Sequence, residues 1–239
     1  DNPDEIQMIG DCFYDAEIGK VGEIVDYHEK FYSNVEPDFL IAQTDLRYLK
    51  VSDRFAGAAK INGCIQEAMT ALAQQEKAYA EMDADDEDIE GMPLNCSMYS
   101  SVHELSFYNR RYLSFCQNSN DYSGGAHGMP WQDGYTFDLE TGKRLTLQDI
   151  VGNSEEEFKE IAVRYFRDLI ETEPEMYWDD ALSYVEEKVS LEWESEFYLT
   201  QEGISLSFGV YELAPYAAGY TEVCIPYEEF DMKIALGDA

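Results

Sequence analysis

The residues that could most readily take part in catalysis lie in one short segment, Ser123-Gly124-Gly125-Ala126-His127-Gly128. Ser123 and His127 could form the nucleophile and base of a hydrolase. That chemistry also needs an acid to orient the imidazole and donors for an oxyanion, and the local sequence offers neither. Three glycines within five positions predict a backbone with positive φ angles or a close approach by another group. The competing interpretation is therefore a tight loop whose histidine hydrogen-bonds the backbone.

Metal and phosphate sites are less well supported by the sequence. The other two histidines do not stand at ligand spacing from His127, and the five cysteines form no zinc pattern. An acidic stretch at residues 83–91 is a candidate for calcium, but Asp88 and Leu94 occupy positions where a calcium loop requires Gly and Glu. We interpret the stretch as an exposed loop. Since no helix closely follows the glycines, phosphate binding is not expected, and we expect neither a metal nor a cofactor.

A second segment, Tyr211-Glu212-Leu213-Ala214-Pro215-Tyr216-Ala217-Ala218-Gly219, connects two predicted strands. Tyrosine offers a large, stiff contact area with a polar tip, which suits binding interfaces. The alternative is a loop that folds onto its own sheet. The candidate binding residues from the two segments are Ser123, Gly124, Gly125, His127, Tyr211, Glu212, Pro215 and Tyr216.

Charge limits the partners that these segments can have. The 239 residues include 50 acidic and 16 basic side chains, giving a net charge of −34, and acidic residues are in excess in both halves. Such a field repels nucleic-acid phosphates and anionic lipid headgroups, so neither nucleic acid nor membrane contact is expected. It attracts basic proteins and speeds their association. The alternative is that the acidity serves only solubility.

The strands that must position these segments are indicated by β-branched and aromatic residues. Residues 24–35 and 39–51 predict two strands, and residues 97–117 predict a further pair that turns at Asn109. A strand at 136–139 closes in a turn at 140–143. The C-terminal strands are expected at 197–200, 204–208 and 221–226.

Three helices are predicted between these strands. Residues 53–82 follow a helical period, with Ser52 or Asp53 as the expected cap. Ser154 and Glu157 stand at the spacing of a capping box and begin a second helix. A third helix is expected over residues 179–189. The buried stripe of the first helix is expected to contain Ile61, Ile65, Met69 and Leu72.

This order of elements predicts an α+β fold, with a mostly antiparallel sheet and two to three packed helices. We expect an N-terminal α+β lobe over residues 1–116 and a C-terminal α+β lobe over residues 117–239, forming one compact unit. No apolar run is long enough to span a bilayer. Because the chain begins with Asp1, a signal peptide or anchor upstream remains compatible with it. Two disulfides or buried free thiols are alternatives for Cys12, Cys64, Cys96, Cys116 and Cys224.

Several motifs resemble those of one bacterial family. Ser-Gly-Gly-Ala-His-Gly at 123–128 is followed by Tyr-Thr-Phe-Asp-Leu-Glu-Thr-Gly-Lys at 135–143 and Ala-Pro-Tyr-Ala-Ala-Gly at 214–219. Over residues 117–230 this string resembles a family of bacterial envelope domains of unknown function. Residues 20–116 more loosely resemble the domain that usually precedes it. Members include the extracellular region of the lysozyme-sensing anti-sigma factor of the sigma-V system, domains that precede polysaccharide deacetylases, and stand-alone lipoproteins.

The resemblance implies an α+β fold and an extracytoplasmic binding role, in a protein that is secreted or anchored at the cell surface. Together with the acidic charge, it leads us to expect a receptor or inhibitor for a basic cell-wall hydrolase such as lysozyme. A peptidoglycan or glycan binding module is the alternative, with Trp131, Trp178 and Tyr216 as candidates for stacking on sugars. The sequence has no deacetylase metal motif, and we do not expect an enzyme.

Overall fold

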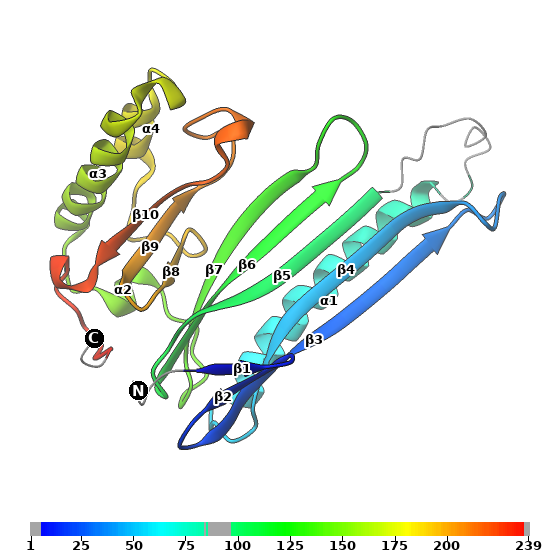
Figure 1. Ribbon diagram of the computed structural model, residues 1–239, viewed down its shortest axis with the longest axis horizontal. Helices are drawn as coiled ribbons and strands as arrows, with labels where there is room; N and C mark the ends of the chain where they lie inside the picture. Colours follow the sequence, from blue (N-terminus) through cyan, green and yellow to red (C-terminus); the bar gives the residue numbers. More distant parts are fainter. Residues whose placement is uncertain (1–5, 84, 86–96, 237–239) are drawn as a thin grey trace. The chain divides into compact units, whose positions relative to one another are not determined.

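The computed structural model describes residues 6–83, 85 and 97–236. The chain forms two compact units: unit 1 contains Asp1–His103 and Gln117–Pro130, and unit 2 contains Glu104–Cys116 and Trp131–Ala239. The chain therefore passes between the units within its fifth, sixth and seventh strands. Figure 1 follows this path in colour from the N-terminus to the C-terminus.

The described residues form ten strands, four α-helices and short 3-10 turns. In chain order they are β1 (Gln7–Ile9), β2 (Cys12–Asp15), β3 (Gly19–Tyr32), β4 (Leu40–Val51), α1 (Ala58–Asp83), β5 (Ser97–Tyr108), β6 (Tyr112–Tyr122), β7 (Met129–Asp138), α2 (Leu147–Ile150), α3 (Glu155–Thr172), η2 (Pro174–Met176), α4 (Ala181–Lys188), β8 (Phe197–Leu199), β9 (Gly203–Phe208), η3 (Tyr216–Ala218), β10 (Thr221–Pro226) and η4 (Tyr227–Glu229). Strands β1 to β7 follow one another in a seven-stranded sheet, and β8 to β10 form a second sheet.

In unit 1 the long helix α1 lies along the strands β3 and β4 (Figure 1). Most of the predicted stripe is buried, since Ile61, Ile65 and Met69 are at most 2% exposed, whereas Leu72 is only partly buried. The expected cap is wrong, because residues 52–57 form turns and α1 begins at Ala58. The chain turns twice before the helix, and the carbonyl of Gly57 accepts the first helical bond from Ile61 at 3.1 Å.

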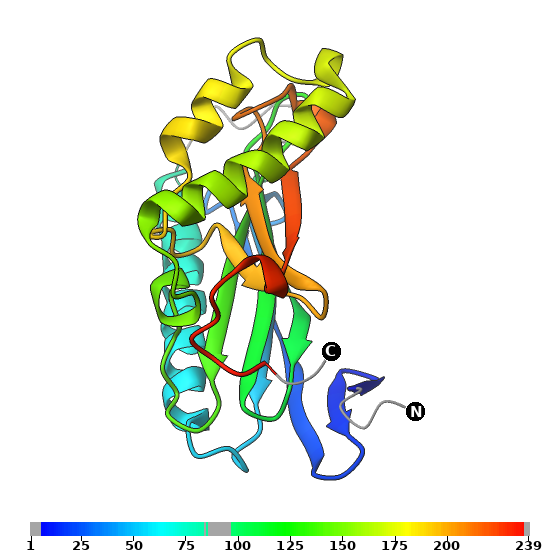
Figure 2. The same ribbon diagram turned by 90° about the vertical axis from the view of Figure 1, so that its left-hand side faces the viewer.

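In unit 2 the helices α3 and α4 cover one face of the sheet β8–β10 (Figure 2). The capping box that the sequence predicts is present, with the Ser154 hydroxyl accepting from the backbone of Glu157 and the Glu157 carboxylate accepting from Ser154. Phe158 and Phe166 of α3 are fully buried in this core. Capping and apolar spacing therefore locate this helix correctly from sequence alone.

The expected α+β class is confirmed. The pairs β1–β2, β2–β3, β3–β4, β8–β9 and β9–β10 are antiparallel, and β4 pairs with β5 in parallel. The long connection through α1 permits this parallel pair, since a parallel neighbour requires a crossover. The hairpin strands β1 and β2 and the single-turn helix α2 were not predicted.

The cysteine alternatives are partly resolved. Among the described residues, Cys12, Cys64, Cys116 and Cys224 are free thiols. Cys96 and most of the acidic stretch at 83–91 lie outside the described residues. No helix in the described part of the chain is long and apolar enough to cross a membrane.

Candidate functional site

The glycine-rich segment is the connection between β6 and β7, and we call residues 123–128 the hairpin loop. Gly124 and Gly125 have φ angles of 102° and 95°, which side-chain-bearing residues rarely adopt. The Tyr122 hydroxyl donates to the carbonyl of Gly125 at 3.1 Å, and this bond closes the loop on itself. The two glycines are therefore required by the local backbone.

His127 and Gly128 complete the same local structure. The His127 Nδ1–H donates to the carbonyl of Gly128 at 2.9 Å, as one of the two sequence interpretations expected. A Cβ atom at position 128 would lie 2.9 Å from the carbonyl oxygen of Asp121, so a residue larger than glycine does not fit at this position. The side chains of Ser123 and His127 are both exposed in this loop.

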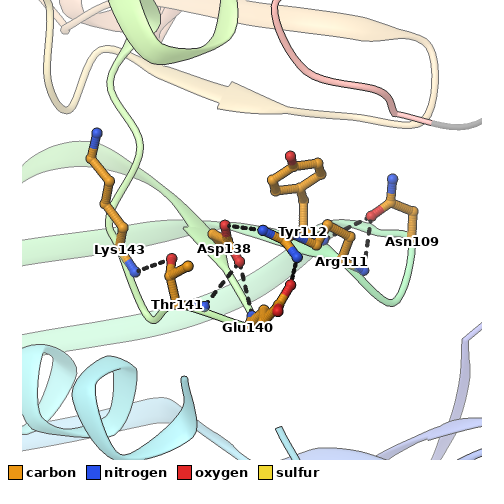
Figure 3. A network of polar contacts seen from close by, with 7 residues as sticks. All are labelled: Asn109, Arg111, Tyr112, Asp138, Glu140, Thr141 and Lys143. Atoms are coloured by element: carbon orange, nitrogen blue, oxygen red, sulfur yellow. Dashed lines mark hydrogen bonds and ion pairs between the residues drawn. The ribbon is translucent and has the colours of Figure 1, made fainter. Parts of the chain in front are cut away.

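The motif at residues 135–143 also has a structural explanation, which Figure 3 shows. The Asp138 carboxylate accepts from the backbone N–H groups of Glu140 and Thr141 at 2.9 and 3.1 Å, which is the pattern of an Asx turn. Arg111 donates to the same carboxylate at 2.7 Å and forms an ion pair with Glu140. These bonds join the β5–β6 turn to the end of β7.

The second predicted segment is held by contacts from distant parts of unit 2, and we call residues 209–219 the aromatic loop. The Glu212 carboxylate accepts from the backbone N–H of Gly209 and, at 3.1 Å, from the Tyr184 hydroxyl of α4. Leu213 and Ala214 are at most 2% exposed, and Leu213 belongs to the core of the unit. The middle of the loop is therefore a fixed part of the fold.

Trp178 attaches the loop from the other side. Its backbone N–H donates to the carbonyl of Leu213 at 2.9 Å, and its indole N–H lies 3.4 Å from the carbonyl of Tyr211. The rings of Tyr211 and Tyr216 lie 5.6 Å apart at an angle of 41°. Trp178 and Tyr211 remain 43% and 46% exposed. We call the group Trp178, Tyr211, Pro215 and Tyr216 the aromatic patch; the first three are exposed and Tyr216 is partly buried.

Backbone strain accompanies this patch. Tyr211 has a φ angle of 68°, whereas the left-handed region is normally occupied by glycine, asparagine or aspartate. Such strain persists only where surrounding contacts enforce it, and it is frequent at binding sites. The neighbourhood is acidic, with Glu212 within the loop and Asp179 and Asp180 exposed after Trp178.

The structure divides the predicted binding residues between the two units. Ser123, Gly124, Gly125 and His127 lie in unit 1, whereas Tyr211, Glu212, Pro215 and Tyr216 lie in unit 2. Trp178 was expected only as a sugar-stacking residue, and its attachment to the aromatic loop was not predicted. Trp131 is partly buried and hydrogen-bonds the Asp133 carboxyl, whose pKa is raised chiefly by burial. In the residues that are described, no three His, Cys, Asp or Glu side chains form a group that could hold a metal.

Two families match separate parts of the chain. Residues 146–228, which include α3 and the aromatic loop, match the family described as "Protein of unknown function (DUF3298)". Residues 41–130, which include α1 and the hairpin loop, match the family described as "Deacetylase PdaC". The association with deacetylases agrees with the expected likeness to domains that precede polysaccharide deacetylases. No curated protein matches the chain.

Solved structures share the fold. A member of the DUF3298 family from Bacteroides fragilis NCTC 9343 is 19% identical, with a TM-score of 0.63 over 95% of this chain and 93% of that one. A DUF3298 family protein from Pseudomonas aeruginosa PAO1 is also 19% identical, with a TM-score of 0.62 over 87% of this chain and 91% of that one. At this identity the likeness concerns the fold.

Proposed function

We propose that this chain is an extracytoplasmic binding module whose aromatic patch docks onto a basic protein, such as a cell-wall hydrolase of the lysozyme type. The match to a deacetylase-associated family supports an accessory role at the cell envelope. We also propose that the chain binds its partner without catalysing a reaction on it.

The observation that carries the proposal is the fixed, exposed aromatic patch on a strongly acidic chain. Interface hot spots are enriched in Tyr and Trp because these side chains bury a large area with little loss of conformational entropy. Glu212 and Trp178 hold the loop through hydrogen bonds and Leu213 is buried, so little further ordering is needed on binding. Exposed aromatic faces also attract Arg and Lys side chains of a basic partner.

The net charge of −34 adds long-range attraction. Electrostatic steering accelerates association and weakens as salt rises, because the screening length is only about 8 Å at 0.15 M. A shaped interface, in contrast, retains most of its affinity at high salt. Salt dependence therefore separates a specific contact from general attraction to an acidic surface.

The test is calorimetric titration of the intact chain with a cationic lysozyme at low salt and again near 0.5 M. We expect saturable binding with a 1:1 stoichiometry at both salt concentrations. Binding that disappears at high salt would mean non-specific attraction and would overturn the proposal. No binding at either concentration would favour a glycan partner, for which the exposed Trp178 ring beside Tyr211 is the supporting feature.

The proposed lack of catalysis is tested separately. An activated ester should not be hydrolysed faster in the presence of the chain than in its absence. Hydrolysis that is lost in Ser123→Ala or His127→Ala would show that the hairpin loop is an active site after all.

A further inference from the structure

A groove lies in unit 1 between α1 and the strands β3 and β4. It encloses about 270 Å³, which is room for one or two small rings. Its lining combines aromatic, amide, hydroxyl and apolar groups. The lining includes Tyr27, Tyr48, Leu46, Gln66, Thr70 and Gln74.

The strand wall of the groove presents two tyrosines. Tyr48 pairs with Val25 and Leu46 pairs with Tyr27, so Tyr27 and Tyr48 are diagonal neighbours on the same face of adjacent strands. Both rings are partly exposed. They offer two flat apolar surfaces, each with a polar tip.

The helix wall presents polar side chains at regular spacing. Gln66, Thr70 and Gln74 recur every fourth residue and therefore form a stripe along one face of α1. The helix rises about 6 Å between members of the stripe. This is close to the length of one sugar ring in a β-1,4-linked chain.

Apolar side chains close the bottom of the groove. Leu46 and Met69 are 1% and 2% exposed, whereas Gln66, Thr70 and Gln74 are exposed. A ligand would thus meet a dry floor, aromatic faces on one side and hydrogen-bonding groups on the other. Ligands with both apolar C–H faces and a rim of hydroxyls fit such a lining.

The hydrogen bonds within the groove are unequal. The Tyr27 hydroxyl donates to the Glu29 carboxylate, and this bond is the main cause that raises the pKa of Tyr27 to about 12. The bonds of Gln66 are long, at 3.5 Å from the Tyr48 hydroxyl and 3.3 Å to Thr70. Long bonds are weak, so a ligand can replace them at little cost.

Charge in the groove is balanced, unlike the charge of the whole chain. Glu29 and Lys77 are the two charged residues of the lining. The field of the acidic chain disfavours anionic polymers. The groove has a single carboxylate, which already accepts a hydrogen bond from Tyr27, so it offers little specific recognition of a cationic polymer.

The groove is accessible along the edge of β3. Strand β2 pairs with β3 over Gly19–Glu23, and within the described residues no strand pairs with the outer edge of β3 from Val25 to Tyr32. An extended peptide could add at such an edge. On the other face, however, an ion pair joins Asp26 to Arg47 and a hydrogen bond joins His28 to Asp45, and charged side chains such as Asp26 and Arg47 oppose strand addition.

We propose that this groove binds a neutral glycan carrying acetamido or hydroxyl groups, with pyranose rings stacked on Tyr27 and Tyr48 and their polar groups bonded to the stripe Gln66, Thr70 and Gln74. The site lies in unit 1 and is separate in sequence from the aromatic patch of unit 2. Its occupation does not depend on the proposed protein partner.

The test is a titration of the isotope-labelled intact chain with tetra-N-acetylchitotetraose, followed by backbone and side-chain amide NMR shifts. We expect saturable shifts confined to residues 25–31, 44–50 and 64–78. Near 0.5 M salt, which screens the general attraction of the acidic chain for cations, the deacetylated, cationic tetramer should bind more weakly. Tyr48→Ala should weaken binding about 3- to 10-fold, as expected for loss of one aromatic contact.

Two further variants keep the test decisive if Tyr48→Ala disturbs folding. Gln74→Ala changes one exposed helix residue and should weaken binding about threefold without changing the melting temperature. Tyr79→Ala removes a tyrosine of α1 that is 57% exposed and outside the lining, and it should leave binding unchanged. Absence of saturable shifts, shifts centred on the aromatic patch, or displacement of the glycan by an extended peptide along β3 would overturn the proposal.

Discussion

The hairpin loop of unit 1 and the aromatic loop of unit 2 each connect two consecutive strands, but different contacts hold them. The hairpin loop is closed by bonds within seven residues, from Tyr122 to Gly125 and from His127 to Gly128. The aromatic loop is attached to Trp178 and Tyr184, which are about thirty residues away in the chain. One loop depends on its own sequence, whereas the other depends on the core of its unit.

This difference decides what each loop can do. A loop that is closed by its own bonds tolerates changes elsewhere in the chain. A loop fixed by distant contacts can hold aromatic side chains in one arrangement, including the strained backbone of Tyr211. Preorganisation of this kind reduces the entropic cost of binding. We therefore expect the aromatic loop to contribute more to affinity than the hairpin loop.

The largest expected effect comes from removing the support of the aromatic loop. Phe208 lies at the end of β9 and is 3% exposed, with ring contacts to Phe166, Tyr184 and Trp193. Phe208→Ala should lower the free energy of unfolding of unit 2 by about 3–5 kcal/mol through lost burial and a cavity. Denaturant unfolding followed by tryptophan fluorescence measures this directly, because all three tryptophans lie in unit 2.

A matched change in the hairpin loop should cost much less. Tyr122→Ala removes a partly exposed ring and one bond to Gly125, so we expect a loss of about 1 kcal/mol or less. That loss should appear in far-UV circular dichroism and not in tryptophan fluorescence. Equal losses for the two variants would show that the loops do not differ in their support.

The two loops should also differ in how much each contributes to the affinity for a partner. If the aromatic patch is the interface, Tyr216→Ala should weaken the affinity for a cationic lysozyme about 30-fold, the effect of losing a hot spot of about 2 kcal/mol. His127→Ala in the hairpin loop should weaken it no more than about threefold. Calorimetry near 0.5 M salt makes this comparison. A larger effect of His127→Ala would move the main contact to the hairpin loop.

Sequence patterns located most of the fold but only part of the candidate sites. The capping box at Ser154 and the stripe of Ile61, Ile65 and Met69 are local signals, and the structure confirms them. The short helix α2 has its own capping box between Thr146 and Asp149, and that signal was overlooked. The cap expected at Ser52 or Asp53 failed because two turns intervene before α1.

Local sequence patterns could not predict the contacts that form the candidate sites. Trp178 precedes α4 and meets the aromatic loop, while Tyr184 of α4 contacts Phe208 at the end of β9. The groove of unit 1 arises where the helical stripe at Gln66 and Gln74 faces tyrosines of β3 and β4. The polar stripe has the spacing of an ordinary solvated helix face, so its sequence alone predicts nothing more.

A buried histidine of unit 1 makes the stability of that unit depend on pH. His103 is 4% exposed, and its Nδ1 accepts the Leu49 N–H at 3.2 Å, so its Nε2–H donates to Gln117. Burial lowers the pKa of His103 to about 4, whereas an unfolded histidine has a pKa near 6.5. The stability that this neutral histidine contributes is fully present above pH 6.5 and is lost as pH falls towards 4, because the unfolded chain takes up the proton first.

The loss should amount to about 2 kcal/mol between pH 8 and pH 5. His103→Gln should remove that part of the pH dependence, measured as the difference in unfolding free energy from the unsubstituted chain by circular dichroism. An unchanged profile in His103→Gln would mean that carboxylates alone set the acid sensitivity of unit 1.

The smallest expected effect has opposite signs for stability and for binding. Tyr211 occupies a φ angle of 68°, which is costly for tyrosine and not for glycine. Tyr211→Gly should relieve that strain but lose the contact with the Tyr216 ring, for a net gain in unfolding free energy of about 0.5 kcal/mol. Affinity for the partner should fall at the same time, because an exposed ring of the aromatic patch is missing. If Tyr211→Gly instead lowers the stability of unit 2 and leaves affinity unchanged, the tyrosine serves the fold, and the strained loop is not evolved for binding.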